Sequence, residues 1–92
     1  MARVPNLKIP PPYRGPTRGV AEVKLSGETV LACLDAAESL FPGFRSQVLD
    51  ASGTPHRFVR LFLNGDELGE GALATPVGPG DEIEVLAAIA GG

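Results

Sequence analysis

The stretch that decides the fold is Phe58-Val59-Arg60-Leu61-Phe62-Leu63-Asn64-Gly65, which continues into Asp66. Its side chains alternate, with Val59, Leu61 and Leu63 facing one way and Phe58, Arg60 and Phe62 facing the other. This period of two is typical of a strand with one buried face. An Asn-Gly pair directly after such a run favours a reverse turn. The sequence therefore predicts a strand over residues 56–63, with His56 as a polar residue at its edge, and a turn over residues 64–66.

Four other segments are predicted as strands by the same alternation or by the turns around them. They cover residues 4–9, residues 20–25, a short piece near Leu68 that leads into an irregular or single-turn crossover, and residues 82–86. The inward-facing residues are Leu7, Ile9, Ala21, Val23, Leu25, Ile83 and Val85. A proline-rich loop over residues 10–19 joins the first two strands, and a turn over residues 78–81 precedes the last one.

One helix is predicted from Val30 to about Phe41, with Thr29 as its N-cap. Its apolar stripe consists of Val30, Leu34, Ala37, Leu40 and Phe41. Pro42 and Gly43 end it, and residues 44–49 favour a second, shorter helix. The order of elements predicts an α+β fold, a mixed sheet of four to five strands with one main helix packed on one face.

Length and composition limit the classes of function. The chain has 92 residues, which suffice for one small domain with a modest core. A net charge of -3 argues against nucleic acid as the main partner. A single cysteine excludes an internal disulfide and a Cys-based zinc site, and it favours a reducing compartment. No apolar run reaches the length of a membrane span or forms a signal peptide, so we expect a cytoplasmic protein.

Charge is distributed unevenly along the chain. All eight basic residues precede position 61, and the acidic residues Asp66, Glu67, Glu70, Asp81, Glu82 and Glu84 follow. This acidic third of the sequence is either a solvated face or a docking surface for a basic partner.

The last residues, Leu86-Ala87-Ala88-Ile89-Ala90-Gly91-Gly92, are uncharged and end in two glycines. Glycine adds no packing and costs extra backbone entropy to order, so a folded core gains little from this pair. A backbone without side chains can instead pass along a narrow channel into another protein. We therefore expect a domain over residues 1–86 and a flexible tail over residues 87–92 that presents Gly92.

These features together resemble the ubiquitin-like sulfur carriers of the β-grasp fold, the family that includes the small subunit of molybdopterin synthase and the thiamine sulfur carrier. The resemblance covers nearly the whole chain. It rests on residues 58–65, on Leu73-Ala74-Thr75-Pro76-Val77 with Gly80-Asp81-Glu82-Ile83, and on Ala90-Gly91-Gly92. His56-Arg57-Phe58-Val59 and residues 86–92 are more similar to the actinobacterial carrier of cysteine biosynthesis.

The resemblance implies a chemistry centred on Gly92. An ATP-dependent activating enzyme would adenylate the Gly92 carboxylate, and a sulfur donor would convert it to a thiocarboxylate that serves an acceptor enzyme. Cysteine or a sulfur-containing natural product is favoured as the destination over molybdopterin or thiazole. The carrier would be a monomer without a catalytic residue, metal or bound cofactor of its own, and ATP would be used by the activating enzyme.

Candidate docking residues for these enzymes are Phe58, Arg60, Phe62, Asp81, Glu82, Glu84, Leu86 and Ile89. Phe58 and Phe62 either form an exposed contact patch or are covered by the loop after the helix. Cys33 is expected to be a buried structural thiol, and His56 lacks neighbours for a triad or a metal site. Two alternatives stay open: a ubiquitin-like modifier conjugated through Gly92, and an interaction module whose two glycines are incidental.

Overall fold

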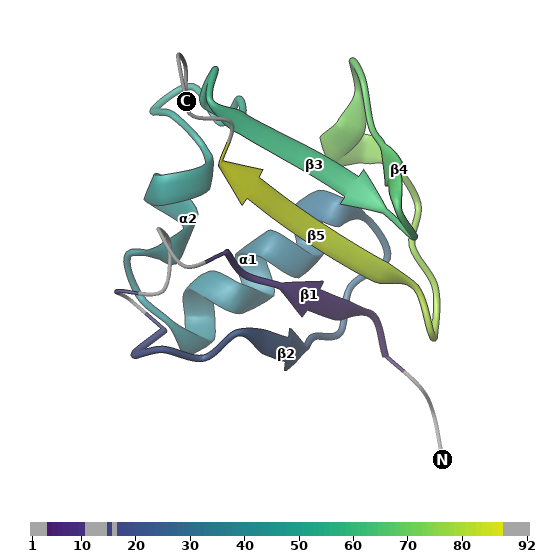
Figure 1. Cartoon of the computed structure of the whole chain (residues 1–92), viewed down its shortest axis with the longest axis horizontal. Coiled ribbons are helices and arrows are strands. Elements are labelled where there is room, and N and C mark those ends of the chain that lie inside the picture. The colour runs from purple at the N-terminus through teal and green to yellow at the C-terminus, as the bar shows by residue number, and fades with distance from the viewer. Residues whose placement is uncertain (1–3, 11–14, 16, 88–92) are drawn as a thin grey trace.

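A five-stranded mixed sheet with helices on one side forms the core of the molecule (Figure 1). The computed structural model describes residues 4–10, 15 and 17–87. The elements in chain order are β1 (Asn6–Lys8), β2 (Glu22–Lys24), α1 (Val30–Leu40), α2 (Phe44–Val48), β3 (Val59–Leu63), β4 (Asp66–Glu67), a 3-10 helix (Ala72–Ala74) and β5 (Glu82–Ala87). The predicted α+β class and the single main helix are confirmed.

The strand order is β2-β1-β5-β3-β4, so the last strand of the chain lies in the middle of the sheet. β1 and β5 run parallel, whereas the other neighbouring pairs are antiparallel. β1 and β2 are shorter than predicted, but pairing continues past them. Ile9 N–H donates to the Ala21 carbonyl at 2.7 Å, and Leu25 N–H donates to the Pro5 carbonyl at 2.9 Å.

α1 covers one face of the sheet and begins where the sequence predicted. The Thr29 hydroxyl accepts a hydrogen bond from Ala32 N–H at 3.1 Å, which satisfies one of the free donors of the first turn. The buried residues of α1 are Val30, Cys33, Leu34 and Ala37. The prediction that Leu40 belongs to the buried stripe is wrong, because its side chain is 57% exposed. Leu40 is the last residue of α1, and the buried stripe includes Cys33 instead.

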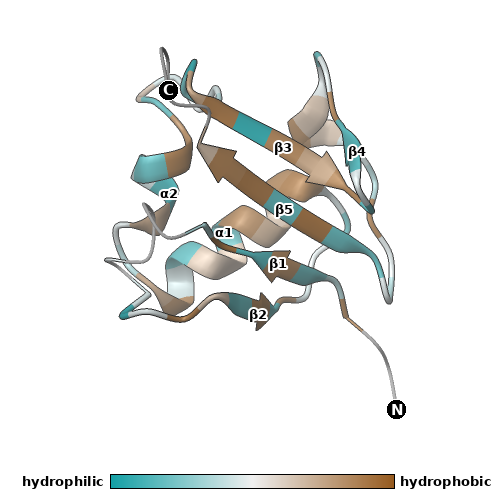
Figure 2. Cartoon of the chain, in the orientation of Figure 1, coloured by the Kyte–Doolittle hydropathy of each residue, from teal (hydrophilic) through white to brown (hydrophobic). Residues whose placement is uncertain are grey.

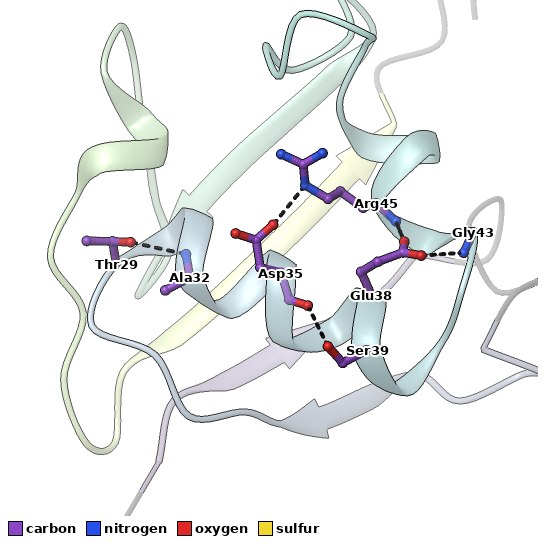
Figure 3. A network of polar contacts seen from close by, with 7 residues as sticks. All are labelled: Thr29, Ala32, Asp35, Glu38, Ser39, Gly43 and Arg45. Atoms are coloured by element: carbon purple, nitrogen blue, oxygen red, sulfur yellow. Dashed lines mark hydrogen bonds and ion pairs between the residues drawn. The ribbon is translucent and has the colours of Figure 1, made fainter.

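A polar network fixes the corner between α1 and α2 (Figure 3). The Glu38 carboxylate accepts hydrogen bonds from Gly43 N–H at 3.0 Å and from Arg45 N–H at 2.8 Å. These two backbone donors, Gly43 first, lower the pKa of Glu38 below its ordinary value. The Arg45 Nε–H group donates to Asp35 at 2.8 Å. Gly43 adopts a φ of 100°, which is why a glycine suits this corner.

The predicted turn after β3 is confirmed. Asn64 has a φ of 51° and Gly65 a φ of 89°, the combination that a two-residue hairpin between right-twisted strands needs. The Asn64 side chain also accepts from Glu82 N–H at 2.9 Å and donates to the Asp81 carboxylate at 3.1 Å. The β3–β4 turn is thereby fastened to the start of β5.

The predicted strand over residues 56–63 begins later than expected. β3 starts at Val59, so the prediction of His56 as a strand-edge residue is wrong. The Nε2 atom of the His56 ring instead forms a hydrogen bond of 2.9 Å with the Ser46 carbonyl. The backbone N–H of His56 donates to the Val48 carbonyl at 3.0 Å. These bonds hold the segment before β3 against α2.

The core lies between the sheet and α1. Hydrophobic and hydrophilic residues alternate along β1 and through the first four residues of β5, whereas Arg60 is the one hydrophilic residue of β3 (Figure 2). The fully or nearly fully buried apolar residues are Leu7, Ile9, Leu25, Val30, Cys33, Leu34, Ala37, Phe44, Val48, Leu49, Val59, Leu61, Ala72, Ile83 and Val85. Within the described residues, none of the helices has the length and apolar character needed to cross a membrane.

Asp81 closes the turn that precedes β5. Its carboxylate accepts a hydrogen bond from Gly78 N–H at 2.8 Å and one from the Asn64 side chain at 3.1 Å. These two donors, Gly78 first, hold the pKa of Asp81 below its ordinary value of 3.8.

We expect Asp81→Asn to lower the free energy of unfolding at neutral pH and to leave it nearly unchanged in strong acid. Because the folded-state pKa is lowered, the contribution of the carboxylate is fully present above the ordinary pKa of 3.8. It is lost as the pH falls through the folded-state value. Urea unfolding of both proteins at about pH 7 and about pH 2 measures the gap. A gap of equal size at both pH values contradicts this role for the carboxylate.

Candidate functional site: the end of β5 and the open face of the sheet

β5 leads from the Asp81 turn to the C-terminal residues. Its last residue, Ala87, lies opposite Val59 at the start of β3. The sheet therefore includes the first residue of the predicted tail range. The tail residues Ala90, Gly91 and Gly92, and the docking candidate Ile89, lie outside the described residues. They are joined to the sheet at this end of β5.

Four docking candidates lie together on the face of the sheet that points away from α1. Ile83 and Val85 are buried toward the helix, so Glu84 and Leu86 point to the opposite face. Cross-strand pairing places Arg60 opposite Leu86 and Phe62 opposite Glu84. Figure 1 shows that no helix in the described part of the chain covers this face.

Exposed apolar side chains gather where β5 ends. Leu86 is 37% exposed, and Phe58, which directly precedes β3, is 49% exposed. The Arg57 guanidinium lies 5.7 Å from the centre of the Phe58 ring, within the range of a cation–π contact. We call Phe58, Arg60 and Leu86 the tail-base patch. The described loop after α1 leaves Phe58 open, whereas Phe62 is half-buried.

The acidic third of the sequence is opposed in space by residues that come earlier in the chain. Lys8 Nζ lies 3.1 Å from a Glu82 carboxylate oxygen, and the Arg60 guanidinium lies 3.5 Å from Glu67. The hydrogen bond and the charge of Glu82 raise the pKa of Lys8. Such exposed pairs add little stability. They do give this face a mixed charge, so acidic residues that follow one another without a basic residue in the sequence lie beside basic residues in the fold.

Asp81 and Glu82 stand apart from the other docking candidates. They lie at the start of β5, whereas Leu86 lies near its end, roughly 16 Å away along a strand. Asp81 serves its turn and Glu82 pairs with Lys8. The structure thus brings together Arg60, Phe62, Glu84 and Leu86, with Phe58 beside them, and places Asp81 and Glu82 at the far end.

A hollow of about 310 Å³ beside Leu86 was not predicted from the sequence. Lys8, Pro10, Glu84 and Leu86 are among the residues that line it. The alternation of Lys8 with Leu7 and Ile9 was a signal that Lys8 faces the open side. The neighbour of β1 in the sheet is set by tertiary structure, and so the local pattern gave no hint of a shared hollow with β5.

The remaining reactive side chains have structural positions. Cys33 is fully buried, and burial raises the pKa of its thiol, which opposes formation of a nucleophilic thiolate. The described residues contain no group of three or more His, Cys, Asp or Glu side chains arranged to hold a metal ion. The described site is therefore a binding surface, with apolar and charged side chains around the end of β5, where the C-terminal residues begin.

Comparison with known proteins is consistent across sequence and structure. The ThiS family model matches residues 13–92. The sulfur carrier protein CysO of Mycobacterium bovis is 35% identical over 89 residues, which cover 94% of this chain and 96% of CysO.

Two solved structures share the fold closely. CysO in the Amycolatopsis orientalis BexX/CysO complex superposes with a TM-score of 0.88 at 31% identity, covering 97% of this chain and 100% of that one. Mycobacterium tuberculosis CysO superposes with a TM-score of 0.85 at 32% identity, covering 92% and 99%. The β-grasp fold implied by the sequence resemblance is confirmed. The chain belongs to the ThiS family, and it is a homologue of the ubiquitin-like sulfur carriers that its sequence resembles.

Proposed function

We propose that this protein is a sulfur carrier whose Gly92 carboxylate is activated and then converted to a thiocarboxylate. The observation that carries the proposal is the match to the ThiS family, which extends to Gly92. The placement of the tail base supports it: β5 ends beside exposed Phe58 and Leu86, where an enzyme can contact the folded domain and the residues after Ala87 together.

The chemistry begins with a carboxylate, which is a poor electrophile because its charge repels nucleophiles and oxide leaves poorly. In the activating enzyme, a Gly92 carboxylate oxygen attacks the α-phosphorus of ATP, pyrophosphate leaves, and an acyl adenylate forms. A sulfur donor at the sulfide level, such as hydrosulfide, then attacks the carbonyl carbon, and the bond to AMP breaks. Loss of the sulfur-bound proton leaves the thiocarboxylate as a portable nucleophile.

The carrier and its enzymes divide the work. The carrier supplies the carboxylate and a docking surface, and the enzymes supply transition-state stabilisation. Ordering the C-terminal residues in an enzyme channel costs entropy, so contacts by the folded domain have to offset it. The tail-base patch is placed to provide them. We place the reaction in the reducing cytoplasm, in keeping with the single, unpaired Cys33.

The acceptor that we favour makes cysteine or a sulfur-containing natural product. The support is the 35% identity to a sulfur carrier named CysO and the similarity to CysO in complex with BexX. Two partners follow: an adenylating enzyme and a sulfur-accepting enzyme.

The deciding experiment is intact-mass analysis of the full chain after incubation with its activating enzyme, ATP and a sulfur source. The expected product differs from the starting protein by the exchange of one oxygen for one sulfur. A mass unchanged under conditions in which a CysO control reacts contradicts the proposal. Covalent adducts with other proteins in lysate, without that product, favour a modifier instead.

We expect Phe58→Ala to lower kcat/KM of the activating enzyme for the carrier about tenfold, equal to about 1.4 kcal/mol, the scale of an aromatic anchor at an interface. The matched control is Leu40→Ala, which removes an exposed apolar side chain at the end of α1 and is expected to leave kcat/KM unchanged. Steady-state kinetics with varied carrier measures both. Equal losses in the two variants, or none for Phe58→Ala, contradict docking through the tail-base patch.

A further inference from the structure

The outer edge of β3 is only partly covered. β4 consists of two residues, Asp66–Glu67, and it pairs with Phe62 and Leu63 alone. The chain then turns away after Leu68, whose N–H donates to the Leu61 carbonyl at 2.8 Å. The first half of β3 therefore pairs with β5 on one side and has no strand among the described residues on the other (Figure 1).

The direction of the backbone groups along β3 follows from the pairing. Asn64 N–H donates to the Glu82 carbonyl at 2.8 Å, so Asn64, Phe62 and Arg60 direct their backbone groups to β5. Val59 and Leu61 direct theirs to the outer edge. The Val59 N–H is taken by the His56 carbonyl at 2.8 Å. Among the described residues, the Leu61 N–H and the Val59 carbonyl have no such partner.

These two groups border a solvent-filled groove. One hollow of about 290 Å³ is lined by Val59 and Leu61, and an adjoining one of about 330 Å³ continues past the 3-10 helix. The two hollows share Pro55, Gly69, Glu70 and Ala72. We call this the β3-edge groove. A donor and an acceptor on one strand edge, next to a space of this size, are the features that strand addition uses.

Two acidic residues and one basic residue, Glu67, Glu70 and Arg60, line the β3-edge groove, which leaves one acid in excess. Glu70 is exposed and makes no ion pair with a described residue. Glu67 on the same rim is held by Arg60 at a long 3.5 Å. No lysine or arginine follows Arg60 in the sequence. A partner segment that carries a basic residue is complementary in charge to Glu70. The C-terminal tail of a second copy is not complementary, because it has no basic residue and ends in a carboxylate.

We propose that the β3-edge groove binds an extended, basic segment of a partner protein as an added strand beside Val59 and Leu61. The segment accepts a hydrogen bond from the Leu61 N–H and donates one to the Val59 carbonyl. An apolar side chain enters the hollow between Pro55 and Ala72, and a lysine or arginine faces Glu70. This surface lies on the side of β3 away from β5, and it requires no chemistry at Gly92.

The test uses the full-length, ¹⁵N-labelled protein and a blocked probe peptide, acetyl-Lys-Val-Lys-Val-Lys-amide. With the peptide at roughly ten times its Kd, hydrogen exchange of the Leu61 amide is expected to slow about tenfold. The matched probe acetyl-Glu-Val-Glu-Val-Glu-amide is expected to bind more weakly, and Glu70→Lys to weaken the lysine peptide about fivefold, the scale of an exposed ion pair. Glu28→Lys, at an exposed acid before α1, is the control and is expected to have no effect.

Three outcomes overturn the proposal. The first is a Leu61 amide that stays unprotected at millimolar peptide. The second is protection confined to β5 and the tail-base patch. The third is protection that grows with protein concentration alone, which indicates pairing between two copies. The intact-mass experiment does not involve the peptide, so failure of either proposal leaves the other intact.

Discussion

Deletion of Gly91 and Gly92 is expected to abolish thiocarboxylate formation and to leave the fold unchanged. The deletion moves the carboxylate two residues closer to the sheet, where it can no longer reach the reacting phosphorus of ATP in the activating enzyme. Reaction between positioned groups depends on near-contact geometry, so product is expected to fall to the background level. The sheet is expected to survive, since every strand among the described residues lies before the deleted glycines.

The measurement combines intact mass with pyrophosphate release, and thermal unfolding checks the fold. A second variant, Gly91→Val, keeps the length and adds a side chain to the segment that enters the channel. It is expected to retain the carboxylate and to react much more slowly. Gly15→Val is the matched control, because a side chain at Gly15 meets nothing within 4 Å. Undiminished product from the deletion variant rules out Gly92 as the reacting group.

Leu34→Ala is expected to destabilise the fold by about 2–5 kcal/mol, as leucine-to-alanine changes in well-packed cores do. Leu34 is 0% exposed and lies on the face of α1 that packs on the sheet. A 92-residue domain has a small core, and its total stability is of the order of 5–15 kcal/mol. The substitution is therefore expected to remove a large part of the free energy of unfolding.

The same substitution at Leu40, on the same helix, is the control. Leu40 is 57% exposed, and its loss is expected to change stability by less than about 0.5 kcal/mol. Urea unfolding monitored by circular dichroism measures both variants. Similar losses at the two positions contradict the placement of Leu40 outside the core.

Features set by neighbours in sequence were predictable. The Thr29 cap, the turn at Asn64 and Gly65 and the inward direction of Val59 and Leu61 were predicted correctly. Each depends on a local preference: a hydroxyl that reaches a free backbone donor, a positive φ, or alternation along a strand. Local preferences act over a few residues, and a sequence displays them directly.

Features set by tertiary contacts were not predictable. Leu40 satisfies helical spacing, yet its side chain is exposed at the end of α1, because spacing alone does not tell which residues pack against each turn. The segment before β3 is held by a hydrogen bond between the His56 ring and the carbonyl of Ser46 in α2, ten residues earlier in the chain. A local pattern does not reveal this contact. The pairing of Lys8 with Glu82 needs β1 and β5 to be neighbours, which no local pattern specifies.

The candidate site divides in the same way. The grouping of Arg60, Phe62 and Leu86 follows from two alternating strands once they pair. The role of Asp81 in its own turn was missed, because its sequence position suggested only one more acid in an acidic segment. The uncovered edge of β3 was missed for another reason. A short strand was predicted near Leu68, but the sequence did not show how many residues of β3 would pair with it.

The parallel pairing of β1 with β5 has a practical consequence. Asn6 lies beside Glu82, and β1 runs toward the end at which β5 gives way to the C-terminal residues. The chain therefore enters the sheet at one end and leaves it at the other (Figure 1). A protein fused ahead of β1, or a surface to which the N-terminus is tethered, would join the sheet at the end opposite to Ala87, the last residue of β5. If the proposed function holds, protein immobilised through its N-terminus is expected to accept sulfur at Gly92 as the free protein does.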